Sequence, residues 1–161
     1  MREWLSFQRP PMTRVEAIES DQADNLSAIH EKSFAHGWST SEFERLLSDR
    51  NTVCDGLFIG KSRTPSGFIM SRRVLDEAEI LSIAIDPKAR LRGFSHALLQ
   101  HHLEELARFG IRTLHLEVDE NNTAALALYR RAKFEITGRR RGYYAQPDGS
   151  RTTALTMSLV L

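Results

Sequence analysis

The 161-residue sequence has a single cysteine, Cys54, which excludes a disulfide within the chain. It has no run of the ~20 apolar residues that a membrane-spanning helix requires. Neither sign of charge is in excess, since 22 Lys and Arg against 21 Asp and Glu leave a net charge of +1. A dedicated nucleic-acid binder needs a basic excess to neutralise phosphates. We therefore expect a soluble cytoplasmic protein that does not contact membranes and is unsuited to direct nucleic-acid binding.

A signal-peptide pattern is also missing at the start of the sequence. Residues 1–12 lack an unbroken apolar stretch of about 7–15 residues, and they include Pro10 and Pro11. We expect these twelve residues to form a flexible tail. Hydrophobic residues make up 41% of the sequence, which is enough for a sizeable core, so residues 13–161 are expected to form one domain.

Alternation and helical spacing of apolar residues predict a mixed α/β order of elements. We expect strands over residues 13–18, 57–61, 68–74, 79–85, 113–118, 134–141 and 152–159. Helices are expected over residues 21–34, after residue 39, over residues 94–109, and from residue 121 or 122 to 132. This order indicates a sheet that is largely antiparallel in its first half, with at least one strand–helix–strand crossover.

Three of these helices carry start signals. Ser39 and Glu42 have the spacing of a capping box, in which side chain and backbone bond reciprocally. Ser20 or Asp21 is expected to cap the first helix, and Asn121 or Asn122 the last.

The segment from Arg90 to Ser95 lies between a predicted strand and an amphipathic helix. Free backbone N–H groups and the positive end of the helix dipole make such a place an anion site suited to a pyrophosphate. Arg90 and Arg92 would add positive charge. The alternative is an ordinary strand-to-helix turn with solvated arginines. The glycine patterns of P-loops and of dinucleotide-binding folds are both absent.

Glu117 lies near the end of a predicted strand, and Tyr129 follows it by twelve residues in the next helix. Such a helix folds back over the same edge of the sheet, so the carboxylate and the phenol can face one cleft as base and acid. Spacing alone favours the other interpretation, in which Glu117 is solvated and Tyr129 is a core aromatic.

Other candidates have ordinary interpretations beside functional ones. The six histidines do not combine with cysteine or carboxylates in metal-ligand spacing, so no metal site is expected. Cys54 is interpreted as a buried structural thiol. Residues 139–141, three arginines next to Tyr143 and Tyr144, could grip phosphate but are more typical of a solvated face. Trp38 is either a core anchor or the lip of a substrate groove.

Several motifs together resemble the GNAT superfamily of N-acetyltransferases. Residues 83–87, then Arg90-x-x-Gly93-x-Ser95, resemble its first cofactor-binding motif, and residues 116–118, 122, 127–129 and 134 resemble the motif that follows. The pattern His30-x-x-x-Phe34-x-x-x-Trp38-Ser39 and residues 139–144 narrow the likeness to the RimI type, the ribosomal-protein-alanine N-acetyltransferases. The similarity covers roughly residues 13–161.

The resemblance implies an α/β GNAT fold, with a mixed, mostly antiparallel sheet that splays open at the strand holding acetyl-CoA and helices that flank it. It implies backbone contacts to the pantetheine arm from Ile83, Ala84 and Ile85, and a further contact from Asn122. It implies that the pyrophosphate is wrapped by the loop and first helical turn: Arg90, Leu91, Arg92, Gly93, Phe94, Ser95 and His96.

The resemblance also implies the chemistry. Glu117 would act as general base on the acceptor ammonium, and Tyr129 would protonate the leaving thiolate, in a direct transfer without a metal. Trp38 and Tyr143 would border the acceptor, which for the RimI type is the N-terminal alanine of a small-subunit ribosomal protein. The alternatives are a relative that acetylates a small amine or a lysine side chain, and a non-catalytic module that binds CoA.

This sequence departs from the family pattern at four positions. Ser95 replaces Gly or Ala and is expected to weaken pyrophosphate binding. Lys133 replaces a glycine, which costs ~1 kcal/mol if the position needs a positive φ. Gly37 replaces a proline and is expected to loosen the loop before Trp38. Asp119 replaces a frequent arginine, which would alter the acceptor preference.

Overall fold

The computed structural model describes residues 11–161. The expected tail, residues 1–12, therefore lies outside the described residues except for Pro11 and Met12. The described residues form seven strands and four α-helices with two short 3-10 turns. In chain order they are β1 (Thr13–Ala17), η1 (Ser20–Gln22), α1 (Ala23–Ser33), α2 (Thr40–Ser48), β2 (Thr52–Ile59), β3 (Gly67–Val74), β4 (Glu77–Ile85), η2 (Pro87–Ala89), α3 (Phe94–Arg108), β5 (Thr113–Asp119), α4 (Thr123–Arg131), β6 (Glu135–Ala145) and β7 (Arg151–Val160).

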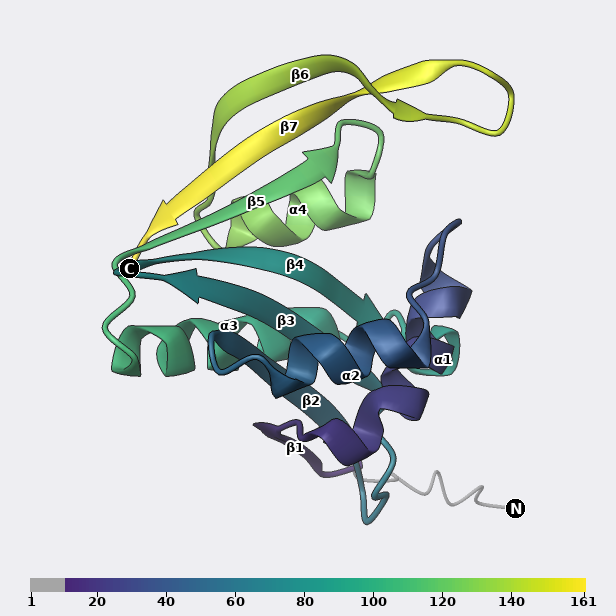
Figure 1. Ribbon diagram of the computed structural model, residues 1–161, viewed down its shortest axis with the longest axis vertical. Coiled ribbons are helices and arrows are strands. Elements are labelled where there is room, and N and C mark those ends of the chain that lie inside the picture. The colour runs from purple at the N-terminus through teal and green to yellow at the C-terminus, as the bar shows by residue number, and fades with distance from the viewer. Residues whose placement is uncertain (1–10) are drawn as a thin grey trace, which may run out of the picture.

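One mixed sheet carries the fold, in the order β1-β2-β3-β4-β5-β7-β6. Every pairing is antiparallel except β4 with β5, which is parallel and is reached by the crossover through α3. The expected α/β class and the mostly antiparallel sheet are confirmed. The parallel pair is the one place where the two halves of the sheet join (Figure 1).

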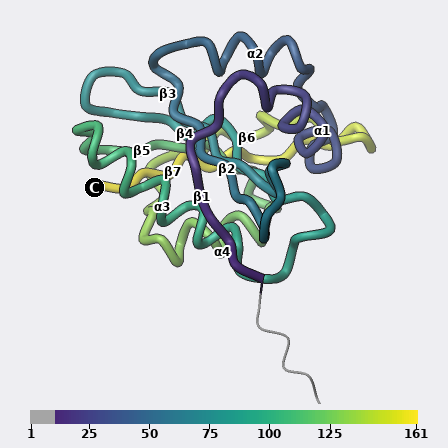
Figure 2. The backbone as a smooth tube through the Cα atoms, turned by 90° about the horizontal axis from the view of Figure 1, so that it is seen from below, coloured from purple at the N-terminus to yellow at the C-terminus, as the bar shows by residue number. Residues whose placement is uncertain are grey.

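Helices cover both faces of the sheet, with α1 and α2 on one side and α3 and α4 on the other (Figure 2). The alternation of β2 and β3 explains why two cores form. Leu57 and Ile69 pack in the core below α3 and α4, whereas Phe58 and Phe68 pack in the core below α1 and α2. Among the described residues, no helix is long and apolar enough to span a membrane.

A β-bulge in β4 shifts this alternation. Met70 pairs with Ser82 and Ser71 pairs with Ile80, which leaves Leu81 as the extra residue. Ile80 and Ile85 consequently both reach the core below α3 although their numbers differ in parity. The bulge lies where β4 begins to leave β5, because the two strands pair only from Glu77 to Glu79 on β4.

The helix starts were predicted with mixed success. The capping box of α2 is present, with Ser39 accepting from the Glu42 N–H and Glu42 accepting from the Ser39 N–H. Asn122 caps α4, as one of the two candidates. The expected cap of the first helix is wrong, because residues 20–22 form a separate 3-10 turn and α1 begins after Gln22 without a side-chain cap.

β2 begins at Thr52, five residues earlier than expected. Asp55 and Gly56 have the composition of a loop, but both are buried within the strand. Asp55 is tolerated because it is paired, as described below. A Cβ at Gly56 would meet Cδ1 of Ile18, so a larger residue there would require the Ile18 side chain to move.

Candidate active site

The central feature of the site is the gap that opens between β4 and β5 beyond their three paired residues (Figure 1). In the described residues, no strand pairs with Ile80–Ile85 on the side that β5 leaves. Alternate residues of the segment Ile83–Ile85 must turn their backbone N–H and C=O groups toward that side. Such an edge has hydrogen-bonding groups available for an extended, amide-bearing chain. An extended, amide-bearing arm such as that of acetyl-CoA fits an edge of this kind, and the contacts from Ile83, Ala84 and Ile85 stay predictions.

The start of α3 provides an anion site next to the end of β4. Leu91 and Gly93 both have a positive φ, 63° and 75°, so the loop turns through two left-handed residues before α3 begins. Gly93 is the N-cap and supplies no side-chain bond, which leaves the first-turn N–H groups of Phe94, Ser95 and His96 for a ligand. His96 Nδ1 is buried without a partner among the described residues. These groups fit a pyrophosphate.

The two arginines of this loop differ. The guanidinium of Arg90 donates from Nε to the Ile85 carbonyl oxygen and from NH2 to the Ser33 hydroxyl, both at 3.0 Å. It therefore ties the end of β4 to α1, and only part of it is available for the phosphate contact that we expected. Arg92 is exposed in the same loop.

Glu117 lies on the face of β5 that points away from α3 and α4. Leu116 and Val118 point into the core on the α3 and α4 side, so the alternation of the strand turns Glu117 to the opposite face, the side of α1 and α2. Its side chain is 30% exposed, and its Oε1 lies 3.3 Å from a guanidinium nitrogen of Arg140. The carboxylate is thus held at the edge of the gap with one weak partner.

Tyr129 comes from α4 on the other side of the sheet. Its ring is 5% exposed and packs against Phe134 with ring centroids 5.6 Å apart. Its hydroxyl makes no hydrogen bond within residues 11–161, and its oxygen is not among the fully buried polar atoms that lack a partner there. Burial raises the pKa of Tyr129 to about 12, so the phenol holds its proton at neutral pH. Glu117 and Tyr129 therefore come from opposite faces of the sheet, and Glu117 lies two residues beyond the last β5 residue that pairs with β4.

Trp38 lies half-buried in the loop between α1 and α2. Its backbone N–H donates to Nδ1 of His30 at 2.9 Å, and its carbonyl accepts from the Ser27 hydroxyl at 2.7 Å. Its ring stacks on the imidazole of His30 at 4.5 Å. A cavity of about 350 Å³ adjoins it and includes Glu31 and Phe34 in its lining. Trp38 is therefore both an anchor and the lip of a groove.

The structure gives Gly37 a steric role beside the expected loosening of this loop, which stays a prediction. A Cβ at Gly37 would lie 2.8 Å from the Cα of Glu31, so glycine lets the loop approach α1 closely. Two hydrogen bonds from α1 then hold Trp38 in place.

Tyr143 lies on β6 and is 48% exposed. The guanidinium of Arg140 lies 4.6 Å from the centre of its ring, and the ring of Tyr144 meets it edge-on at 5.0 Å. Because Arg140 also reaches Glu117, the structure brings Tyr143 next to the candidate base through one shared cation.

Asn122 and Asp119 border the far end of β5. The side-chain oxygen of Asn122 caps α4 by accepting from the Ala125 N–H, and its amide nitrogen is left to donate. The carboxylate of Asp119 accepts from the Thr152 hydroxyl at 2.7 Å and from Gln146 at 3.3 Å. Asp119 therefore braces the β6–β7 hairpin.

Sequence reasoning missed a buried polar chain behind the site. Nδ1 of His102, on α3, lies 2.6 Å from the Asp55 carboxylate, and its Nε2 lies 2.7 Å from the Ser71 hydroxyl. All three residues are at most 2% exposed. These three side chains join α3 to β2 and β3. The one signal in the sequence was an aspartate, Asp55, next to Gly56 among apolar residues.

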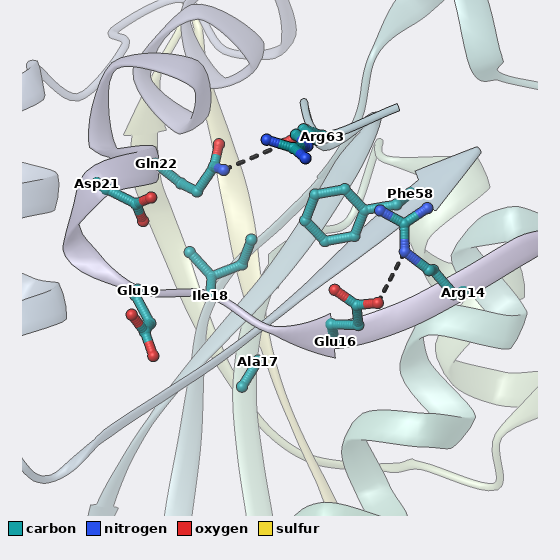
Figure 3. A pocket seen from close by; sticks show the side chains of 9 residues that line it. All are labelled: Arg14, Glu16, Ala17, Ile18, Glu19, Asp21, Gln22, Phe58 and Arg63. Atoms are coloured by element: carbon teal, nitrogen blue, oxygen red, sulfur yellow. Dashed lines mark hydrogen bonds and ion pairs between the residues drawn. The ribbon is translucent and has the colours of Figure 1, made fainter. Parts of the chain in front are cut away.

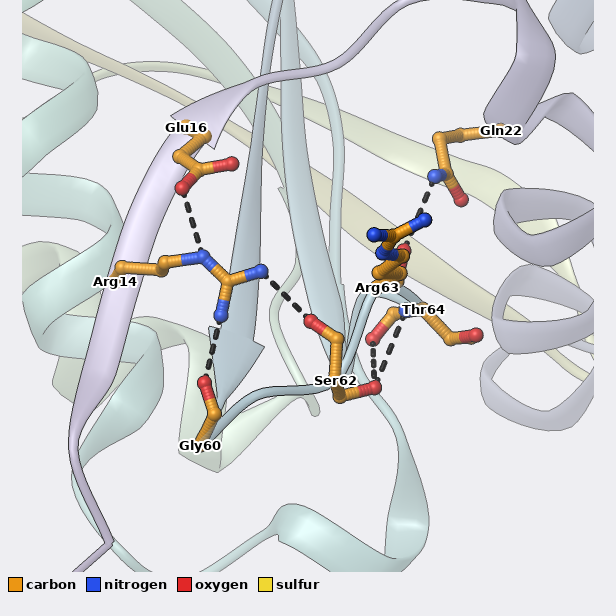
Figure 4. Close-up of polar contacts among 7 residues, drawn as sticks. All are labelled: Arg14, Glu16, Gln22, Gly60, Ser62, Arg63 and Thr64. Atoms are coloured by element: carbon orange, nitrogen blue, oxygen red, sulfur yellow. Dashed lines mark hydrogen bonds and ion pairs between the residues drawn. The ribbon is translucent and has the colours of Figure 1, made fainter.

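A second cavity, of about 300 Å³, lies at β1 and η1, away from the gap (Figure 3). Its most prominent cation, Arg14, is already used within the chain. Arg14 donates to Glu16, to the Gly60 carbonyl and to the Ser62 carbonyl, each at 2.7 Å (Figure 4). These bonds pin the β2–β3 loop to the edge strand. No group of three potential metal ligands occurs in residues 11–161.

The fold and this site define an acyltransferase class, and the comparisons with known proteins agree. A sequence profile of the Acetyltransferase (GNAT) family matches residues 23–134. The chain belongs to this family and is an N-acetyltransferase.

Individual relatives narrow the likeness. The ribosomal protein bS18-alanine N-acetyltransferase of Escherichia coli (strain K12) is 34% identical over 148 residues, which cover 92% of this chain and 97% of that one. The enzyme of the same name from Haemophilus ducreyi is 31% identical over 91% of this chain and 99% of its own.

Solved structures share the architecture. The crystal structure of the ribosomal-protein-S18-alanine N-acetyltransferase from Escherichia coli has a TM-score of 0.85 and 32% identity, covering 92% of this chain and 94% of its own. Arabidopsis thaliana NAA60 in complex with acetyl-CoA has a TM-score of 0.80 at 18% identity, covering 93% and 99%, and shows the fold alone.

Proposed function

We propose that this N-acetyltransferase transfers an acetyl group from acetyl-CoA to the α-amine of the N-terminal alanine of ribosomal protein bS18. The observation that carries the proposal is the 34% identity to an enzyme of that name, spread over 97% of its length. The location of Glu117 at the mouth of the β4–β5 gap supports it, because an acceptor amine needs a base there.

Acetyl-CoA supplies the activated acetyl group as a thioester. The free edge of Ile83–Ile85 holds its amide-bearing arm, and the N–H groups at the start of α3 hold its pyrophosphate. Asn122, whose amide is not used by its cap, adds a donor at the arm. Holding the acceptor and the thioester together in the gap supplies most of the rate, up to ~7–11 kcal/mol in favourable cases.

Glu117 and Tyr129 divide the proton transfers. An α-ammonium with a pKa near ~8 needs little help to lose a proton at neutral pH. Glu117, on the open face, takes that proton from the acceptor, directly or through a water. Tyr129, on the α4 face, keeps its proton because its pKa is raised to about 12 by burial. A protonated phenol can donate to the thiolate as that group leaves, although the raised pKa makes Tyr129 a weaker acid than a free phenol.

The acceptor enters on the face that Glu117 occupies, between Trp38 and Tyr143. Both rings are partly exposed and come from opposite sides of the gap, one from the α1–α2 loop and one from β6. The cytoplasm is where an enzyme with a ribosomal substrate would act.

The proposal is tested by thiol release from acetyl-CoA with three acceptors in turn. They are a peptide that begins with free alanine, its N-blocked twin, and a panel of small amines. Turnover with the free-alanine peptide alone is expected. Turnover with small amines alone would overturn the ribosomal substrate, and turnover with the N-blocked peptide would move the reaction to a side chain.

A further inference from the structure

Arg140 lies between two residues that the proposed function uses. Its NH1 is 3.3 Å from Oε1 of Glu117, and its guanidinium carbon is 4.6 Å from the centre of the Tyr143 ring. The cation therefore occupies the space between the candidate base and a wall of the acceptor site. An acceptor ammonium would need the same carboxylate.

Strand register explains why Arg140, and not its neighbours, reaches this position. Arg140 pairs with Ala154 of β7, which in turn pairs with Asp119 of β5, so Arg140 lies one row beyond Glu117 on the open face. Arg139 precedes it on the same strand and turns to the opposite face. The side chain of Arg139 has no hydrogen bond, ion pair or cation–π contact in the described part of the chain.

The contact that Arg140 makes is suited to being broken. Its side chain is 56% exposed, and its ion pair is a single long N···O contact rather than a two-pronged one. Ion pairs this exposed contribute little to stability. The ring of Tyr143 is 48% exposed and can still hold the guanidinium by a cation–π contact when another cation binds the carboxylate.

We propose that Arg140 is a displaceable placeholder for the acceptor ammonium and competes with it for Glu117. This inference rests on the proposed role of Glu117 as the base. With no acceptor bound, Arg140 neutralises the carboxylate. An acceptor must displace the guanidinium, and peptides that also contact the Trp38 and Tyr143 side of the site do so more readily than small amines. Arg140 is therefore a positioning residue that raises the threshold for weak acceptors.

The test compares R140Q with R139Q, which removes the same charge from the other face of the same strand. R140Q should lower the KM for the acceptor by about two- to fivefold relative to R139Q, the range expected of an exposed ion pair. The KM for acetyl-CoA should not change. R140K, which keeps the cation, should stay near the wild-type KM. An acceptor KM in R140Q that equals or exceeds that of R139Q would overturn the proposal.

A double-variant cycle separates this competition from a general structural effect. The measurement is calorimetric affinity of the CoA-loaded protein for the free-alanine peptide and for the best small amine. In an E117Q background, R140Q should leave that affinity unchanged, because the carboxylate that both cations share has lost its charge. An equal gain in both backgrounds would overturn the placeholder role.

The two proposals fail in different ways. If the wild-type protein acetylates only small amines, the bS18 substrate is wrong. The acceptor KM values of R140Q and R139Q can then still be compared with those amines as acceptors. If the free-alanine peptide is the acceptor but R140Q and R139Q have the same acceptor KM, the proposed function stands and the placeholder role is wrong.

Discussion

Nδ1 of His102 lies 2.6 Å from the carboxylate of Asp55, and both side chains are at most 3% exposed. The pair joins the helix that begins at the candidate pyrophosphate site to a central strand of the sheet. Ser71 completes the chain by contacting the other imidazole nitrogen at 2.7 Å. A buried polar group that loses its partner is costly, whereas replacing both partners by apolar groups is often neutral.

This contrast gives a stability prediction. His102→Leu should lower the free energy of unfolding by about 3–5 kcal/mol, because Asp55 is left buried without its partner. The double variant Asp55→Val/His102→Leu should recover most of that loss. Urea unfolding of the three proteins measures it. A double variant as unstable as the sum of the single variants would contradict this view of the pair.

His30 should make the protein sensitive to mild acid. Burial lowers its pKa to about 4, from an ordinary value near 6.5. As the pH falls from 6.5 toward 4, the unfolded chain binds a proton that the folded chain rejects, so stability is lost across that window. Between pH 7 and pH 5 the loss should be about 2 kcal/mol. It is measured by urea unfolding with Trp38 fluorescence as one signal.

Two variants serve as controls for His30. His30→Asn keeps an acceptor for the Trp38 N–H and should remove this part of the pH dependence. His36→Asn, at an exposed histidine in the same loop region, should keep the wild-type dependence. A His30→Asn protein that loses as much stability in acid as wild type would show that another group is responsible.

Lys133 should be a site where glycine stabilises the protein. Its φ is 74°, a left-handed conformation that L side chains adopt at a cost. Lys133→Gly should raise the free energy of unfolding by about 1 kcal/mol. Lys133→Ala removes the charge but keeps the Cβ, and it should not reproduce the gain. Thermal unfolding of both variants checks this, and equal gains would assign the effect to charge.

Substitutions at Glu117 and Tyr129 should lower kcat without changing the affinity for acetyl-CoA. Glu117→Gln should lower kcat by about 100-fold or more, the range of general base catalysis. Tyr129→Phe removes the proton donor for the thiolate and should lower kcat by about tenfold or more. Neither should change the affinity for acetyl-CoA, measured by calorimetry. Wild-type kcat in both variants would remove them from the mechanism.

Local signals in the sequence predicted the local structure well. The Ser39–Glu42 capping box forms because both bonds lie within one turn of helix. The sequence raised a positive φ at Lys133 only as a condition, and the structure shows that the residue has a φ of 74°. The motif positions of Glu117 and Tyr129 identified the two candidates. Which face of the sheet each side chain lies on could not be predicted from their spacing.

Contacts between distant segments could not be read from the sequence. Asp55 and His102 are 47 residues apart, and no periodicity connects a strand residue to a helix residue at that distance. The contact between Arg140 and Glu117 could not be predicted either, because it depends on the register of β5, β7 and β6. β2 begins earlier than the sequence predicts, because Asp55 and Gly56 have the composition of a loop. Asp55 is buried in the strand because His102, on α3, pairs with it.

The position of the transferred acetyl group tests the central claim most directly. A peptide that begins with alanine and carries an internal lysine is incubated with the protein and acetyl-CoA, and fragment mass spectrometry locates the product. We predict one acetyl group on the alanine α-nitrogen and none on the lysine, with the product lost in Glu117→Gln. Acetylation of the lysine side chain, with the α-nitrogen left free, would contradict the account.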